Sequence, residues 1–428
     1  MATKQVPVAL LEFGMYIAEL DRPWTDTPFR FQGFYLRTGQ QLEALRKYCR
    51  YVFVDAARSE PAAHGARATP DLAATTPRPI PAAGMRIRGS ARYPELTDVE
   101  SEIKAASALY AQSVQALQAL FVPLSQGRAL LEGAQVQAAV ARLADSVVRN
   151  PDALLLMSKM REKSAAAHAR ALQVSIYMMV FARFLQLERA EIELLGLLGL
   201  LQDIGKTRLP AALLEKQGPL TPEESEVVKK HVELSGHILG ATSGLPPALA
   251  VLALLHHERQ DGGGYPRGLK ADQIGLYGSM AAICDTFDAL LAFRPYAEQS
   301  SPSAAADFLL KERGAAFHAE LVEQFIQCIG PFPLGSVVEL NSGEVGIVIA
   351  LHPEQRLKPK VAVVLDASGG PVRANRILDL DKDPRTESGE PYRIRRTREH
   401  GMFEYDPREL SLSTTRWWRA GLTGLMFR

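Results

Sequence analysis

The segment from His256 to Pro266, HHERQDGGGYP, constrains the fold of this chain more than any other stretch. Neutral imidazole is the commonest side-chain metal ligand in proteins. Adjacent side chains on a regular helix point about 100° apart, so His256 and His257 can reach one ion only where a helix ends. The glycines after Asp261 supply such an end, and glycine lets a ligand approach the backbone closely. The segment therefore predicts a metal site beside a substrate-binding turn.

A second candidate group follows the apolar helical stretch from Glu193 to Leu201. There the chain reads QDIGK, with Asp203 and Lys206 as its charged residues. An unpaired carboxylate at the end of a buried helix is costly, and a metal ion removes that cost. Further histidine and aspartate candidates lie on or beside other predicted helices, at His168, His231 and Asp285. Metal sites in helical bundles are built from inward side chains on facing helices, so we expect these residues to converge.

The residues around these candidates indicate how they are held. Thr221 to Glu224, TPEE, form a capping box with proline in the first turn, which sets the start of the helix that carries His231. Glu258 is placed to orient an imidazole as a hydrogen-bond partner. Asp288 lies three residues after Asp285 on one helical face, where we expect it to orient Lys206 or backbone groups.

These motifs occur together in the order and spacing of one known family. The span from about His168 to Val322 resembles an HD-GYP domain, the bacterial branch of the HD phosphohydrolases that hydrolyses cyclic di-GMP. The matching segments are QDIGK, GPLTPEESEVVKKHVELSG, HHERQDGGGYPRGL, AAICDTFDAL, FRPY and GAAFHAELV. The resemblance implies an HD-type helical bundle. It also implies a metal-dependent phosphodiesterase that converts cyclic di-GMP to pGpG or GMP in bacterial second-messenger signalling.

The resemblance implies a dinuclear site with two divalent ions, Mn, Fe or Mg. One ion would be held by His168, Gln202, Asp203 and Asp285. The other would be held by Asp203 as a bridge together with His231, His256 and His257. Gln202 stands where the family has the histidine of its His-Asp doublet. A glutamine oxygen is a neutral, weaker ligand that suits Mg or Mn best.

The resemblance also implies which residues act on the substrate. Asp203 and Lys206 would be catalytic, and Gly264, Tyr265 and Pro266 would form a lip that contacts cyclic di-GMP. Arg294 would clamp a phosphate, for which the arginine fork is suited. The same lip is implied as a docking surface for diguanylate cyclase domains.

Gln202 leaves more than one function open. The first is a cyclic di-GMP phosphodiesterase, slowed by a weaker ligand. The alternative is a catalytically degenerate domain that binds cyclic di-GMP or a signalling partner without hydrolysis. A third is a purely structural regulator acting through the N-terminal domain, against which the histidine pair argues.

Changes in composition along the chain predict a mainly α protein with two small appendages. A flexible linker is expected where Ala, Pro, Arg and Thr dominate without apolar periodicity. The first helices of the helical domain either brace the bundle or mediate a homodimer. The predicted segments are a small α+β domain (1–56), an Ala/Pro-rich linker (57–98), the helical HD-GYP domain with its bracing helices (99–332), a small β domain (333–385) and a tail (386–428).

Composition excludes several classes of protein. The net charge is +1, which argues against a binder of nucleic-acid polymers. The three cysteines are scattered and form no CxxC pair, which fits a reducing compartment. The N-terminus has no signal-peptide pattern, and the longest apolar stretches are too short to span a bilayer. We therefore expect a cytoplasmic protein without a membrane span.

Each of two aromatic clusters has two possible roles. The first is Trp24, Phe29, Phe31 and Phe34. It could bind a signal or partner, but ordinary core packing is favoured. The C-terminal stretch SLSTTRWWRAGLTGLMFR could form a helix that docks on the protein or a partner, with membrane contact as the weaker alternative.

Overall fold

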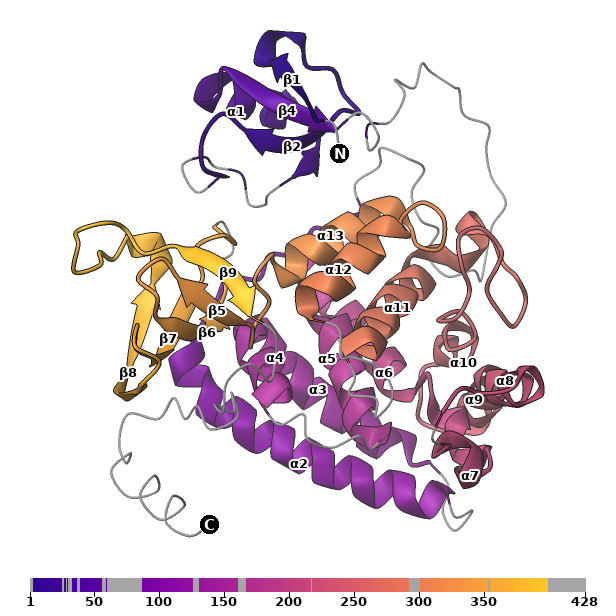
Figure 1. The fold of residues 1–428 in the computed structure, drawn as a ribbon. Coiled ribbons are helices and arrows are strands. Elements are labelled where there is room, and N and C mark those ends of the chain that lie inside the picture. The colour runs from indigo at the N-terminus through magenta and orange to yellow at the C-terminus, as the bar shows by residue number, and fades with distance from the viewer. Residues whose placement is uncertain are drawn as a thin grey trace.

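The computed structural model describes the chain in twelve stretches: residues 3–24, 27, 29, 33–36, 39–55, 59, 87–125, 131–160, 167–216, 218–291, 301–352 and 355–398. Within them, a small N-terminal α+β unit, a helical domain and a C-terminal β-sheet follow one another along the chain, and the C-terminal sheet lies beside the helices (Figure 1). This architecture confirms the predicted fold class, mainly α with a small appendage at each end. The predicted tail lies outside these residues from position 399 onward.

The N-terminal unit is a four-stranded antiparallel sheet with one helix. Its strands follow the order β1-β4-β2-β3. The elements are β1 (Thr3–Pro7), the short 3-10 helix η1 (Val8–Leu10), β2 (Tyr16–Leu20), β3 (Phe34–Tyr35), α1 (Gly39–Tyr48) and β4 (Tyr51–Asp55). Val52 and Val54 alternate with more exposed residues along β4, as expected for a strand with one face on a core.

The aromatic cluster of this unit is part of its core. Trp24 and Phe29 are buried, and their ring centroids lie 6.3 Å apart in an edge-on arrangement. Phe34 lies 4.8 Å from Phe29 between ring centroids. Core packing is therefore confirmed for these three rings, while Phe31 lies outside the described residues. Leu357 of the C-terminal sheet region joins the same hydrophobic cluster.

The helical domain is built from helices that share one continuous hydrophobic core. Long α2 has buried residues at a spacing of three or four, which is the pattern of an amphipathic helix. The helices are α2 (Val99–Ser125), α3 (Gly133–Arg149), α4 (Pro151–Met160), α5 (Ala167–Phe184), α6 (Arg189–Leu201), α7 (Ala211–Leu214), α8 (Pro222–Lys229), α9 (His231–Ala241), α10 (Ala248–Leu252), α11 (Ala271–Leu291), α12 (Pro302–Lys311) and α13 (Ala319–Ile329).

Helices α5 and α6 pack closely, and their contact places the end of α6. A Cβ atom on Gly199 would lie 2.8 Å from the Cα of Ser175, so only glycine allows this approach. The Ser175 hydroxyl also donates to the carbonyl of Gly196 at 2.7 Å. The last residues of α6 are buried without interruption from Leu195 to Leu201. Helix α6 then ends at buried Gln202, where the candidate site begins.

The predicted linker ends earlier than position 98. Ile87 is buried in the core of the helical domain, and the N–H of Gly89 donates to the carbonyl of Leu185 at 2.8 Å. The Arg88 side chain donates to Gln324. Residues 87–98 are thus packed on the helices, because an apolar side chain and backbone hydrogen bonds tie them down. Residues 60–86 lie outside the described part of the chain.

The C-terminal sheet extends beyond the predicted boundary at 385. Its strands follow the order β8-β7-β6-β5-β9, all antiparallel. The strands are β5 (Val337–Leu340), β6 (Val345–Ala350), β7 (Lys360–Leu365), β8 (Pro371–Asp379) and β9 (Ile394–Arg398), with the short 3-10 helix η4 (Leu380–Lys382) after β8. Strand β9 joins the sheet because it pairs with β5, where Glu339 also accepts hydrogen bonds from Arg396.

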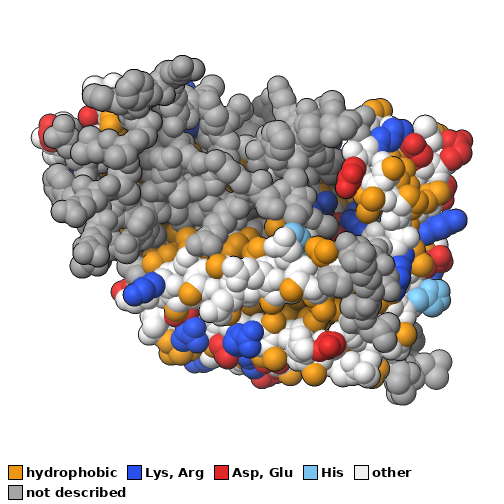
Figure 2. All heavy atoms as spheres, turned by 90° about the horizontal axis from the view of Figure 1, so that it is seen from below, with side chains coloured by type: hydrophobic (Ala, Val, Ile, Leu, Met, Phe, Trp, Pro, Cys, Tyr) orange, Lys and Arg blue, Asp and Glu red, His pale blue; other side chains and the backbone are white. Residues whose placement is uncertain are grey.

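One described helix, α11, is long and apolar enough to cross a membrane. Its most apolar window is 83% buried inside the protein, which is the environment of a core helix. Charged side chains of both signs are interspersed on the described surface seen from below (Figure 2). This mixture agrees with the small net charge of +1.

Asp152 joins the helical domain to the C-terminal sheet. Its carboxylate, in the first turn of α4, accepts the N–H of Leu351 at 2.7 Å, just after β6. The side chain is buried, and burial raises the pKa of the Asp152 carboxyl from 3.8 to about 6. Because the folded pKa is raised, the stability that Asp152 contributes is fully present below its unfolded pKa and is lost as the pH rises through about 6.

We predict that Asp152→Asn stabilises the fold above about pH 6 and not below about pH 4. The amide oxygen can still accept the N–H of Leu351, while the buried negative charge is removed. The rise of the Asp152 pKa to about 6 corresponds to at most about 3 kcal/mol in the free energy of unfolding. Denaturant unfolding of both proteins at about pH 4 and about pH 8 measures the difference. The exposed Asp145→Asn is the control, and an equal pH trend in both variants would contradict the prediction.

Candidate metal centre

The candidate ligands come together where several helices begin or end. Asp203 follows α6 and precedes the 3-10 helix η3 (Ile204–Arg208). His231 is the first residue of α9, and the histidine pair follows α10. A Cβ on Gly205 would lie 2.1 Å from the carbonyl oxygen of His231, so glycine at this position lets η3 pack directly on α9.

The start of α8 follows the predicted capping box. The Thr221 hydroxyl accepts the N–H of Glu224 at 3.3 Å, and the Glu224 carboxylate accepts the N–H of Thr221 at 2.7 Å. The capping box is thereby confirmed, but the helix that it starts ends at Lys229, and His231 opens the next helix, α9.

Two buried imidazoles present lone pairs to the same space. Nδ1 of His231 lies 2.6 Å from the carbonyl oxygen of Val228, and Nδ1 of His256 lies 2.8 Å from that of Ala253. A carbonyl can only accept a hydrogen bond, so each Nδ1 carries the proton of its neutral ring. The two Nε2 atoms, 3.4 Å apart, are therefore left without a proton between them.

His257 completes the set. A ligand atom from each of Asp203, His231, His256 and His257 lies within 4.8 Å of the others. Burial lowers the pKa of the His257 imidazole, and the neighbouring His256 lowers it further. A neutral imidazole is the form that binds a metal. The ring of His257 is stacked on the ring of Tyr265, with centroids 4.6 Å apart.

Asp203 is held in its charged form between these imidazoles and Lys206. Burial alone would raise the pKa of its carboxyl, but the positive charge of the Lys206 ammonium holds it well below its ordinary value. Its Oδ2 accepts from the Lys206 ammonium at 2.6 Å. Its Oδ1 lies 3.1 Å from Nε2 of His231.

The arrangement passes the test of fit for one metal ion. Two unprotonated imidazole nitrogens, a third imidazole from His257 and one carboxylate oxygen lie close together, and Asp203 Oδ1 has no described hydrogen-bond partner. Repulsion among lone pairs is relieved by a cation. This nitrogen-rich set with one carboxylate suits a divalent transition metal. We call Asp203, His231, His256 and His257 the histidine cage.

The lip that the sequence predicts lies against this cage. Both carboxylate oxygens of buried Glu258 accept backbone N–H groups, from Arg267 and Leu269, each at 2.8 Å. Glu258 therefore braces the lip, which corrects the expectation that it orients an imidazole. A Cβ on Gly264 would lie 2.4 Å from the backbone nitrogen of Arg259, so glycine is required there. Pro266, the last residue of the lip, follows Tyr265 directly.

The other predicted ligands are not members of the histidine cage. His168 is not among the residues grouped within 4.8 Å, and neither is Asp285. Gln202 is buried, and neither polar atom of its amide has a described hydrogen-bond partner. Ligand roles for these three residues stay predictions. Arg294 lies outside the described residues.

Arg170 is a residue that the sequence reasoning missed. It lies on α5, two residues after His168, and its guanidinium contacts Asp285 at 3.3 Å and Asp288 at 3.0 Å. The expectation that Asp288 orients Lys206 is thereby corrected, since Lys206 binds Asp203. A cation on a helix otherwise buried on most sides is the signal that could have found Arg170.

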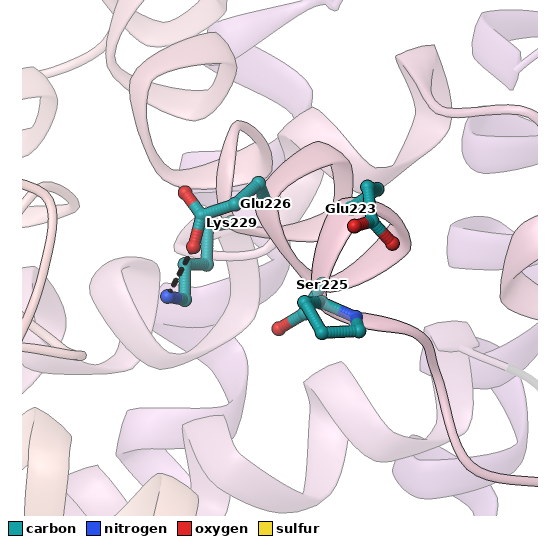
Figure 3. Close-up of a pocket in the computed structure, with 5 residues that line it drawn as sticks. Glu223, Ser225, Glu226 and Lys229 are labelled. Atoms are coloured by element: carbon teal, nitrogen blue, oxygen red, sulfur yellow. Dashed lines mark hydrogen bonds and ion pairs between the residues drawn. The ribbon is translucent and has the colours of Figure 1, made fainter.

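A surface hollow of about 360 Å³ lies on α8 and is lined by none of the candidate ligands. Figure 3 shows its acidic residues Glu223 and Glu226, with Lys229 ion-paired to Glu226 at 2.6 Å. The Lys229 ammonium also lies 5.4 Å from the ring centroid of Tyr265. The hollow therefore borders the lip, while the chemistry of the site lies in the histidine cage.

Comparison with known proteins agrees with these features. Models of a domain of unknown function, an HD domain and a KOW domain associated with HD domain match residues 3–131, 153–321 and 337–386. A protein of Pseudomonas aeruginosa named as a cyclic di-GMP phosphodiesterase is 30% identical over 386 residues, which is 90% of each chain. The chain belongs to the HD-GYP family of HD-domain proteins.

Two further relatives match over shorter stretches. A cyclic di-GMP phosphodiesterase response regulator of Xanthomonas campestris is 37% identical over 147 residues, 34% of this chain and 39% of the relative. A 3'3'-cGAMP-specific phosphodiesterase of Vibrio cholerae is 32% identical over 168 residues, 39% of this chain and 32% of the relative. The match to the domain of unknown function covers the small N-terminal unit and extends into the first helix of the helical domain.

We predict that His231→Ala weakens metal binding by at least about a hundredfold. Loss of a residue that only orients a ligand costs about 10–100-fold, so loss of a ligand should cost more. Titration of metal-free protein with Mn(II) in a calorimeter measures the change. His237→Ala, on the exposed side of the same helix α9, is the control and should bind like the parent. Equal losses in the two variants would show that His231 is not a ligand.

Proposed function

We propose that this HD-GYP protein hydrolyses a phosphodiester bond of cyclic di-GMP to give linear pGpG, which a second cleavage would convert to GMP. The observation that carries the proposal is the histidine cage, in which unprotonated imidazole nitrogens and the Asp203 carboxylate face one another. The names of the relatives from Pseudomonas and Xanthomonas support the substrate. The sequence predicts two divalent ions, Mn, Fe or Mg, and the histidine cage accounts for one.

Individual residues of the site would have separate roles in the hydrolysis. A divalent ion, when bound, would polarise the phosphate and lower the pKa of a water molecule. Lys206, whose ammonium already binds Asp203 and is 26% exposed, would neutralise charge that develops on the phosphate oxygens. Tyr265 would present its ring, stacked on His257, as an apolar wall for a guanine base. Glu258 would keep this lip in place.

Several finer assignments belong to the same proposal. Gly264 and Pro266 would shape the lip, and Arg294 would clamp a phosphate, as the resemblance implies. Cyclic di-GMP would be the small-molecule partner, and diguanylate cyclase domains would dock on the lip. The protein would act in the cytoplasm, where the nucleotide is made and its three cysteines remain reduced. Homodimerisation through the first helices of the domain is part of the proposal as well.

Binding without hydrolysis is the alternative, and a specific observation favours it. Gln202 provides no imidazole, and the Asp285 carboxylate contacts the Arg170 guanidinium. In this alternative the histidine cage would still take a metal ion, and the lip would still bind the nucleotide. The two functions therefore differ in turnover and not in binding.

We predict that purified protein, loaded anaerobically with Mn(II) or Fe(II), converts cyclic di-GMP to pGpG, and that Asp203→Ala abolishes the reaction. Loss of Asp203 removes the carboxylate of the cage and the partner of Lys206. Chromatography of the nucleotide products measures turnover. Asp145→Ala on the exposed surface of α3 is the control and should react like the parent. Parallel reactions with 3'3'-cGAMP test which cyclic dinucleotide is preferred.

The outcomes separate the two functions. Turnover by the parent that is lost in Asp203→Ala establishes the enzyme. Calorimetric binding of cyclic di-GMP without turnover, with turnover gained in Gln202→His, establishes the binding domain. A parent that neither binds nor cleaves either dinucleotide contradicts both.

A further inference from the structure

We propose that the Arg170 guanidinium takes the place of one of the two metal ions, so that the centre holds a single ion in the histidine cage. Arg170 would then be a permanent positive charge facing the substrate phosphate. The count of ions rests on the geometry alone. Only the contact with phosphate rests on the proposed function.

The first argument is the pairing of Asp285. Its Oδ1 lies 3.3 Å from Nη2 of Arg170, while Nε of Arg170 lies 3.0 Å from Oδ2 of Asp288. Both carboxylates are buried, and a buried carboxylate needs a counter-charge. Arg170 supplies it from within the chain. A guanidinium has donors and no lone pair, and it cannot be deprotonated in a protein, so it excludes a cation from the space it fills.

The second argument is that few suitable ligands remain for a second metal ion. Gln202 offers a neutral amide, whose two polar atoms are buried without a described partner. His168 lies outside the group that the histidine cage forms. Asp203 directs Oδ1 to the cage and Oδ2 to Lys206. A second ion would thus meet a weak neutral ligand and a carboxylate already paired with arginine.

The third argument is the balance of charge. The carboxylates of Asp203, Asp285 and Asp288 are opposed by the cations of Lys206 and Arg170. These side chains together carry one net negative charge. One divalent ion turns it into one net positive charge, which complements a phosphodiester anion. A second divalent ion would add two more positive charges beside a guanidinium, where like charges repel.

The fourth argument concerns access. The Arg170 side chain is 32% exposed, whereas the side chains of Asp285 and Asp288 are 7% and 3% exposed. The planar guanidinium fork matches the oxygens of a phosphate group. Arg170 can therefore remain bound to its carboxylates and still present N–H donors to a ligand. Arg170 would thus offer the substrate phosphate the positive charge that a second metal ion would offer in a dinuclear centre.

The ion count tests the proposal directly. Metal-free protein is incubated with excess Mn(II) without oxygen, desalted and analysed for metal per chain. The parent should hold about one ion and show the electron paramagnetic resonance of an isolated Mn(II). Two ions per chain in the parent, with the spectrum of an exchange-coupled pair, would overturn the proposal.

Variants at Arg170 give the matched comparison. Arg170→Lys keeps the positive charge and should stay at about one ion, whereas Arg170→Met removes it and should admit a second. Arg170→His combined with Gln202→His supplies two imidazoles and should hold about two. Arg183→His, on the same helix but bonded to backbone carbonyls at its far end, should stay at one. A double-histidine variant that melts like the parent and still holds one ion would contradict the proposal.

The test is independent of the proposed hydrolysis, because it uses Mn(II) alone. A protein with one ion and no turnover keeps this inference and removes the proposed enzyme. A protein that hydrolyses cyclic di-GMP and holds two ions supports the proposed enzyme and overturns this inference. Should Arg170→Met fail to fold, the count and the spectrum of the parent still decide the matter.

Discussion

The carboxylate of Asp203 lies just after the C-terminal end of α6, where burial and the helix dipole both destabilise a negative charge. The last residues of α6 are buried from Leu195 to Leu201, and the negative end of the helix dipole adds to the cost of a carboxylate there. Lys206 offsets part of this cost through its 2.6 Å hydrogen bond. The other oxygen faces His231 and His256, whose own geometry leaves lone pairs and not protons toward it. The centre is thus built around an anion that only a further cation satisfies.

The fold brings its ligands to this carboxylate by close backbone packing. Gly199 allows α6 to lie against α5, and Gly205 allows η3 to lie against α9. The carbonyls of Val228 and Ala253 then set which nitrogen of each imidazole is free. None of these contacts involves the metal itself. The cage is therefore arranged by the backbone before an ion arrives, which is how a rigid site keeps its geometry at low cost.

Sequence alone predicted the cage residues by motif and spacing, because adjacent histidines, a capped helix and an aspartate after an apolar helix leave recognisable patterns. The fold class and the small domain before the helices followed in the same way. Packing that depends on a single side chain left weaker signals. The stretch from Ile87 was assigned to a linker, and β9 was assigned to the tail, since neither shows long periodicity. The brace from Glu258 to the lip joins residues whose pairing no local pattern reveals.

Arg170 illustrates the same limit with a functional consequence. In the sequence, a cation two residues after His168 indicates only the polar edge of a helix. The packing of α5 on α11 is what brings Arg170 to Asp285 and Asp288. Those two aspartates need a positive charge whether or not the protein is an enzyme, because both are buried. In a centre with two metal ions one ion meets that need; here an arginine meets it without any cofactor. Replacement of an ion by a side chain preserves charge but not Lewis acidity, so the Lewis acidity of this centre would come from the one ion of the histidine cage.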